Sequence, residues 1–107
     1  MANNFSSSNS RLTNNNLTTV VSTTSNKQIM IGCLVANTGT ASINVDVMLN
    51  DGSNDRFLVK EAPVTQGSAL EVISGKVVIP SGGAVKVKSD NASGNADVVV
   101  SLLTDVT

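Results

Sequence analysis

KVVIPSGGAVKVK, residues 76–88, is the stretch that decides the fold class of this chain. Its proline fixes φ and lacks a backbone donor, and its two adjacent glycines can adopt positive φ, so we expect the chain to turn here. After the turn Val85 and Val87 alternate with lysines, which places the valines on one face of a strand and the ammonium groups on the other. The stretch therefore predicts two strands joined by a tight reversal, with an apolar face that a second layer must cover.

Short strands and polar turns continue along the rest of the chain. Residues 43–50 alternate apolar and polar side chains, which is typical of a half-buried strand, whereas both faces of residues 28–36 are apolar. The Asp-Gly step within residues 50–55 predicts a hairpin turn, and Pro63 indicates a sheet edge. Besides the two strands of 76–88, we expect strands at residues 17–24, 28–36, 43–50, 56–60, 69–73 and 96–103. The pattern predicts an all-β fold, an antiparallel β-sandwich of jelly-roll or Ig-like type with seven to eight short strands.

The beginning of the chain has a different composition. Ser, Thr and Asn make up 18 of residues 1–26, and such a polar tract cannot form a core of its own. We therefore divide the chain into an extended polar N-terminal arm, residues 1–16, and a β-sandwich domain, residues 17–107, that is expected to fold without the arm. The composition is typical of a flexible tail, and the alternative is an arm that a partner holds in place, with Phe5 as its anchor.

The residue types that most enzymes use are missing. The chain has no histidine, tryptophan or tyrosine, so the commonest general base and metal ligand is absent. Nucleophile-elbow and phosphate-loop patterns do not occur, and no apolar run is long enough for a membrane-spanning helix. A net charge of −1 gives no electrostatic reason to bind nucleic acid or an anionic membrane. We expect a protein that is not an enzyme and has no cofactor, metal or small-molecule substrate.

Three features that could suggest a site have simpler structural interpretations. The only cysteine, Cys33, lies in an apolar run and is interpreted as a small buried hydrophobic residue. Asp51, Ser53 and Asp55 match the first ligand positions of a calcium loop, but the glycine and the bidentate glutamate that such a loop requires are replaced. Phe57 lies in a strand and is predicted to be a core residue.

The order of several segments carries a resemblance to a known group of proteins. These segments are MANNF (1–5), VANTG (35–39), INVDV (43–47), LEVISGKVVI (70–79), GAVKVKS (83–89) and DVVVSLL (97–103). Together they resemble small virion structural proteins of tailed bacteriophages, especially marine and cyanobacterial phages. The resemblance implies an accessory β-sandwich of the virion, on the capsid surface, at the neck or along the tail. The turn at residues 79–83 and the C-terminal residues 102–105 depart from the pattern of that group, so contacts made there by relatives are not carried over.

The expected function is accordingly that of a bacteriophage virion structural protein, a capsid decoration or cement protein or a neck or tail component. Such proteins act through repeated subunit contacts multiplied by symmetry, and they need flat apolar surface and strand edges more than reactive groups. Its partners would be other copies of itself and other virion proteins, and its location would be the virion after synthesis in the host cytoplasm. The alternative function is a receptor- or glycan-binding module of a phage tail fibre.

Candidate contact residues follow from the two regions that could face a partner. The arm offers one aromatic, one charged and one aliphatic side chain, and several strands have apolar residues on a second face. The candidates are Phe5, Arg11, Leu12, Met30, Leu34, Met48, Leu58 and Val99. For the strand residues the other interpretation is an ordinary two-layer core.

Overall fold

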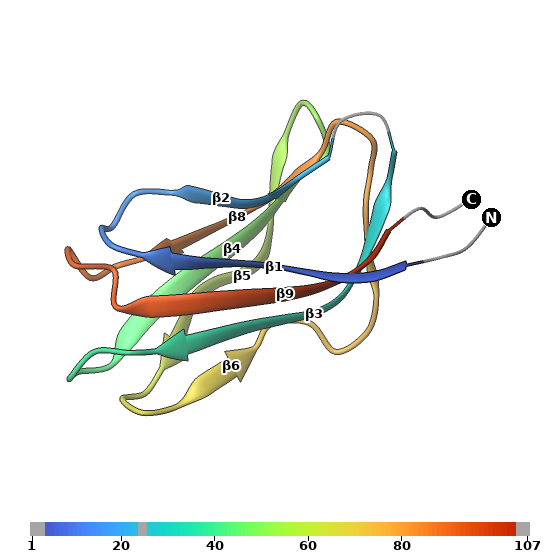
Figure 1. Cartoon of the computed structure of the whole chain (residues 1–107). Helices are drawn as coiled ribbons and strands as arrows, with labels where there is room; N and C mark the ends of the chain where they lie inside the picture. Colours follow the sequence, from blue (N-terminus) through green and yellow to red (C-terminus); the bar gives the residue numbers. More distant parts are fainter. Residues whose placement is uncertain (1–3, 24–25, 105–107) are drawn as a thin grey trace.

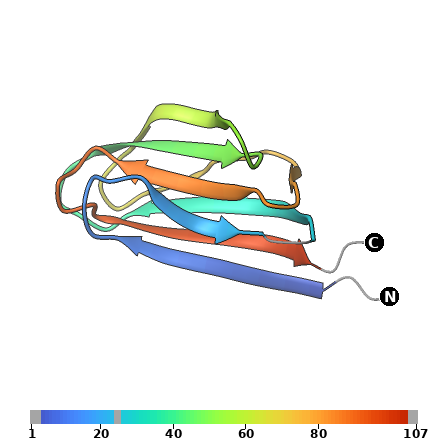
Figure 2. The ribbon, with the colours of Figure 1, turned by 90° about the horizontal axis from the view of Figure 1, so that it is seen from above.

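The computed structural model describes residues 4–23 and 26–104, and this part of the chain consists of β-strands, turns and loops. The strands are β1 (Asn4–Leu12), β2 (Thr18–Ser22), β3 (Gln28–Asn37), β4 (Ile43–Asn50), β5 (Asp55–Val64), β6 (Ala69–Glu71), β7 (Val77–Ile79), β8 (Ala84–Ser89) and β9 (Ala96–Thr104). They form two antiparallel sheets that pack face to face (Figures 1 and 2). The expected all-β sandwich is confirmed. Within the described residues no helix has the length and apolarity to cross a membrane.

The strand order distinguishes between the two expected sandwich types. Sheet A has the order β1-β9-β3-β6, with β7 also paired to β3, and sheet B has the order β2-β8-β4-β5. The pairings are nested, because β1 pairs with β9, β2 with β8, β3 with β6 and β7, and β4 with β5. A long antiparallel ribbon rolled into two layers has this connectivity, so the sandwich is a jelly roll.

Strands β6 and β7 occupy one strand position beside β3. β6 pairs with residues 34–36 and β7 with residues 28–30, both antiparallel, and residues 72–76 leave the sheet between them. On this side of β3, the break leaves the backbone of Cys33 without a strand opposite it, whereas on the other side Cys33 pairs with Val100 of β9. The Glu71 carboxylate accepts the Cys33 N–H at 3.0 Å, and the N–H of Val72 donates to the Cys33 carbonyl at 2.8 Å. Nine segments therefore fill eight strand positions, one more segment than the upper end of the prediction.

The core lies between the sheets and consists largely of valine and other aliphatic side chains from alternate strand positions. Val85 and Val87 are fully buried, whereas the side chains of Lys86 and Lys88 face away from the core, as the alternation predicts. Asn37 is a buried polar residue whose amide donates to the carbonyls of Ala41 at 2.8 Å and Val64 at 3.0 Å. All buried side-chain nitrogen and oxygen atoms of the described residues have hydrogen-bond partners.

The hairpin expected at residues 76–88 is only partly correct. The turn forms as predicted, with the Gly83 N–H donating to the Pro80 carbonyl at 2.9 Å and Gly82 at a φ of +77°. However, the two strands do not pair with each other. β7 lies in sheet A beside β3, and β8 lies in sheet B between β2 and β4. Alternation specifies which face of a strand is buried, but it does not specify the neighbouring strand.

Residues 4–12 also differ from the expected N-terminal arm. They form β1, an edge strand that pairs with β9 in unbroken register from Asn4 opposite Thr104 to Leu12 opposite Ala96 (Figure 2). Leu12 is 2% exposed, and the Ser8 hydroxyl donates to the Val20 carbonyl of β2 at 2.7 Å. Because backbone pairing supplies the hydrogen bonds, a strand of small polar residues can join the sheet without contributing much to the core.

The prediction that Phe57 is a core residue is wrong, because its side chain is 49% exposed. The register of β4 and β5 shifts between the pairs Val47–Val59 and Met48–Phe57, so β5 has one extra residue at this point. That residue, Leu58, packs against the core together with Val59. The bulge thereby places Phe57 on the outer face of sheet B.

Residues 4–12 are expected to contribute to stability, and two substitutions in β1 test this. Leu12→Ala should lower the free energy of unfolding by about 2 to 5 kcal/mol, because it leaves a cavity in the core. Phe5→Ala, in the same strand but at a position that is 80% exposed, should change it by less than about 0.5 kcal/mol. Urea unfolding of both variants gives the comparison. Equal, small effects would mean that β1 is not part of the cooperative unit.

Candidate functional site

The outer face of sheet A carries two rows of side chains that cross the sheet in register. The first row contains Phe5 on β1, Leu103 on β9, Ile29 on β3 and Val78 on β7. Residues directly opposite each other in neighbouring strands point to the same face, so these four apolar side chains lie side by side. Four strands that are distant in sequence therefore contribute to one apolar row.

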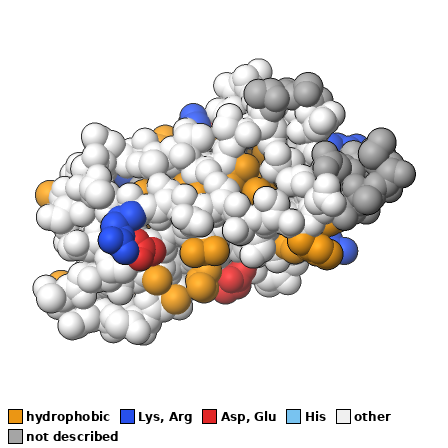
Figure 3. Space-filling view, viewed as in Figure 1, with side chains coloured by type: hydrophobic (Ala, Val, Ile, Leu, Met, Phe, Trp, Pro, Cys, Tyr) orange, Lys and Arg blue, Asp and Glu red, His pale blue; other side chains and the backbone are white. Residues whose placement is uncertain are grey.

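The second row lies further along β1, β9 and β3, towards the C-terminal end of β1, and has β6 in place of β7. It contains Asn9, Val99, Leu34 and Glu71, of which Leu34 and Val99 are 39% and 43% exposed. The small residues Ser7, Ser101 and Gly32 separate the two rows and leave the surface flat between them. Figure 3 shows hydrophobic side chains gathered on this side of the molecule. We call the two rows with the small residues between them the apolar face of sheet A.

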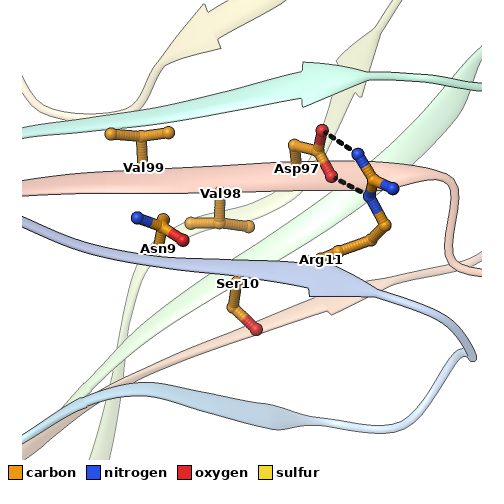
Figure 4. Close-up of a pocket in the computed structure, with 6 residues that line it drawn as sticks. All are labelled: Asn9, Ser10, Arg11, Asp97, Val98 and Val99. Carbon is orange, nitrogen blue, oxygen red and sulfur yellow. Dashed lines mark hydrogen bonds and ion pairs between the residues drawn. The ribbon is translucent and has the colours of Figure 1, made fainter.

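An ion pair lies at one end of the apolar face. Arg11 of β1 donates through Nε to Asp97 Oδ1 at 2.8 Å and through Nη2 to Oδ2 at 3.1 Å, and both side chains point to the outer side of the sheet (Figure 4). These hydrogen bonds lower the pKa of Asp97 and raise the pKa of Arg11. A shallow hollow of about 350 Å³ lies beside the pair, lined by Asn9, Ser10, Arg11, Asp97, Val98 and Val99. The two parallel hydrogen bonds orient the guanidinium, and the opposite charges of the two side chains compensate each other.

The outer face of sheet B has a different character. An open hollow of about 570 Å³ is lined by Asn15, Asn16, Leu17, Asp46, Met48, Phe57 and Lys88. The Lys60 ammonium lies 5.3 Å from the centroid of the Phe57 ring, a cation–π contact. Asp46 also accepts the Glu61 N–H at 2.7 Å. Apolar, amide and charged groups are mixed on this face, whereas the charged groups of the apolar face of sheet A are the Arg11–Asp97 pair at one end and Glu71 in the second row.

The described side chains that could suggest reaction chemistry have structural roles. Cys33 is fully buried, and desolvation, with a smaller contribution from the Glu71 charge, raises the pKa of its thiol to about 12. The Asp51 carboxylate accepts the N–H groups of Ser53 at 2.9 Å and Asn54 at 2.8 Å, which lowers its pKa and closes the hairpin turn. Within residues 4–23 and 26–104, no three His, Cys, Asp or Glu side chains are grouped so that they could hold a metal ion.

The structure brings together some of the candidate contact residues and separates others. Those on the outer side of sheet A are Phe5, Arg11, Leu34 and Val99, whereas Met48 lies on the outer face of sheet B. The residues that pack into or against the core are Leu12, Met30 and Leu58. The first two are almost fully buried in the chain itself and so offer no surface to a partner. Their strands turn these positions towards the other sheet.

Sequence analysis did not select Ile29, Val78 and Leu103 as contact residues. Each is one of several apolar residues in its own strand, and nothing local distinguishes it. They become a row only because β7, β3 and β9 pair in a particular register. The one available signal was that both faces of residues 28–36 are apolar, but the candidates were taken from the face of Met30 and Leu34 and not from that of Ile29.

Comparison with known proteins does not identify the chain. No protein-family model matches it, and no curated protein matches its sequence. The two outer faces of the sandwich are therefore the features from which we infer its function.

Burial of the Cys33 thiol predicts a specific dependence of stability on pH. In the unfolded chain a cysteine ionises near pH 8.5, whereas in the folded chain the thiol keeps its proton to about pH 12. Between these values only the unfolded state loses the proton, so the free energy of unfolding should fall with rising pH, by at most about 1.4 kcal/mol per pH unit.

The control for this prediction is Cys33→Ala, which removes the thiol and keeps every other ionisable group. Chemical unfolding at a series of pH values from 7 upward should show a shallower decline for the variant than for the natural chain. Parallel curves for the two proteins would contradict a thiol that remains protonated in the fold. In parallel, a thiol reagent should label the natural chain only after unfolding.

Proposed function

We propose that this chain is a non-enzymatic structural subunit of a bacteriophage virion, a capsid decoration or cement protein or a neck or tail component. It binds its neighbours through the apolar face of sheet A. The observation that carries the proposal is the position of the exposed hydrophobic side chains. Of the six large ones among the described residues, Phe5, Leu34, Val78 and Val99 share this one face.

An apolar surface of this form suits contact with another protein. Scattered exposed hydrophobic residues are ordinary, but their concentration on one flat face is typical of a protein contact. Here the Arg11–Asp97 pair lies at one end, and Glu71 lies beside β3 with its carboxylate bonded to a backbone N–H. Docking on this face would bury apolar side chains next to charged groups that already have hydrogen-bond partners, because Arg11 and Asp97 bond each other and Glu71 accepts a backbone N–H.

Two further observations support the proposal. The jelly-roll arrangement occurs in viral capsid domains as well as in lectin domains, so the fold is compatible with a virion role by analogy. The order of the sequence segments from residue 35 to residue 103 resembles small virion proteins of tailed phages. Both observations agree with a surface that offers apolar area for contact with another protein.

The proposal is tested by acidic substitutions on each outer face. Leu34→Asp with Val99→Asp places two charges on the apolar face, and Leu17→Asp with Phe57→Asp is a matched control on the other side. The control positions are 39% and 49% exposed, close to the 39% and 43% of the test positions. Complementation of a phage that lacks the gene, followed by quantification of the chain in purified particles, should show at least a tenfold loss for the sheet A variant alone.

Circular dichroism of the purified variants would show that both retain the β-sheet structure. Normal incorporation of the sheet A variant, or loss of the sheet B variant instead, would contradict the assigned face. Absence of the natural chain from purified particles would contradict the virion role itself.

A second function, the receptor- or glycan-binding module of a tail fibre, is favoured by the hollow on sheet B. Phe57 presents a half-exposed ring there, next to Asp46, Asn16 and Lys88. An aromatic face can pack against the C–H face of a sugar ring while carboxylate and amide groups bind its hydroxyls.

This alternative predicts that the isolated protein binds saccharides of the host surface and that Phe57→Ala abolishes the binding. Phe5→Ala, which removes the other aromatic ring, is the matched control and should leave binding intact. A glycan panel followed by titration calorimetry provides the measurement. No binding across the panel would eliminate the alternative and leave the structural role.

A further inference from the structure

We propose that β1 pairs with β1 of a second copy of this chain, antiparallel about a twofold axis at Ser8. The two A sheets would then form one continuous sheet. The inference deepens the proposed function, because it names one partner of the structural subunit. It concerns the edge of sheet A, whereas the proposed docking surface is its face, so the two can be tested separately.

The free edge of β1 differs from the other sheet edges. Edge strands usually carry features that prevent further pairing, such as short length, bulges, proline or lysine. β2 has a bulge between Thr19 and Val21, β5 contains Lys60, Pro63 and two register shifts, and β6 and β7 have three residues each. β1 has nine residues without proline, lysine or any break in register, and its single charge is Arg11. Among the described edges it alone lacks all of these protective features.

The symmetry of the pair restricts its register. The backbone N–H and C=O groups of successive residues point alternately to the two edges of a strand. Two strands can therefore pair only if residues whose N–H and C=O groups face the shared edge lie opposite each other. In a twofold antiparallel pair the numbers of opposite residues therefore sum to an even value. A sum of 16 centres the pair on Ser8, the midpoint of Asn4–Leu12, and pairs all nine residues. Any other allowed register leaves residues at the ends unpaired.

The side chains fit this register. It places Phe5 of each copy opposite Arg11 of the other, and Ser7 opposite Asn9, all on the outer side of sheet A. Phe5 is the most exposed large hydrophobic residue described, and Arg11 is held in place by Asp97, with 73% of its side chain exposed. An aromatic ring packs well against the aliphatic stem and guanidinium of an arginine. The two arginines are about 20 Å apart along the strands, so they do not repel each other strongly.

The other side of β1 is already fixed in place. Ser8 donates its hydroxyl hydrogen to the Val20 carbonyl of β2, and Leu12 is buried in the core. Small serine side chains at alternate positions leave room for a second strand to approach. The edge is thus preorganised, and pairing would not require β1 to change its conformation.

Disulfide trapping tests both the contact and its register. Ser7→Cys and Asn9→Cys variants, prepared separately, should form a mixed disulfide when combined and mildly oxidised, because these positions lie opposite each other. Each variant alone should form at least tenfold less disulfide, because equivalent positions are diagonal neighbours, farther apart than the roughly 7 Å limit between Cα atoms. The native Cys33 does not compete, since it is fully buried. Equal cross-linking in all three mixtures, or none, would overturn the proposed register.

The oligomeric state of the full chain gives an independent test. The natural protein should be a dimer by light scattering, and Asn9→Lys should shift it to a monomer by adding a charge at the free edge. Thr19→Lys adds the same charge to the bulged edge strand of sheet B and should leave the dimer intact. A monomeric natural chain at millimolar concentration, or loss of the dimer in Thr19→Lys as well, would overturn the inference. If Leu34→Asp with Val99→Asp still forms the β1 disulfide but is lost from particles, the edge contact and the face contact are distinct.

Discussion

The pairing of β9 with β1 on one side and β3 on the other is the interaction on which the fold depends. Its outermost pair joins Asn4 and Thr104, almost the full length of the chain apart. β9 also supplies Ala96, Val98, Val100 and Leu102 to the core. Because this strand is central in sheet A, both the sheet and the core remain incomplete until Ala96–Thr104 are in place. Such nonlocal pairing is typical of β-sandwiches, which fold more slowly than proteins with local contacts.

Alternation and turn residues in the sequence predicted the features that depend only on neighbouring residues. Alternation predicted that Val85 and Val87 are buried, and turn residues predicted the reversals at 50–55 and 80–83. Properties that depend on distant strands could not be read in this way. The partner of β7 depends on β3, and the exposure of Phe57 depends on a bulge that shows only in the pairing of β4 with β5. β1 was assigned to an arm because its composition is polar, although its backbone pairs throughout with β9.

The sequence predicted that the candidate site would be an apolar contact surface, but it did not predict all the residues that form it. Apolar residues on a second strand face indicated contact surface, and Leu34 and Val99 do lie together on sheet A. The same reasoning could not separate them from Met30, which faces the core. The distinction arises at a bulge near Gly32, where the register of β3 against β9 shifts. The extra residue there changes which alternate positions of β3 face the core. A face formed by four strands is a property of the pairing register, and no single strand contains the information.

The serine-rich composition of β1 has a consequence for synthesis of the chain. Arg11 emerges from the ribosome 86 residues before its partner Asp97. At a translation rate of about 5 to 20 residues per second, β1 remains unpaired for roughly 4 to 17 s before β9 is synthesised. An apolar, β-branched segment left unpaired for so long would tend to aggregate with its counterparts on other nascent chains. Serine and asparagine side chains keep β1 hydrated until β9 has been synthesised and can pair with it.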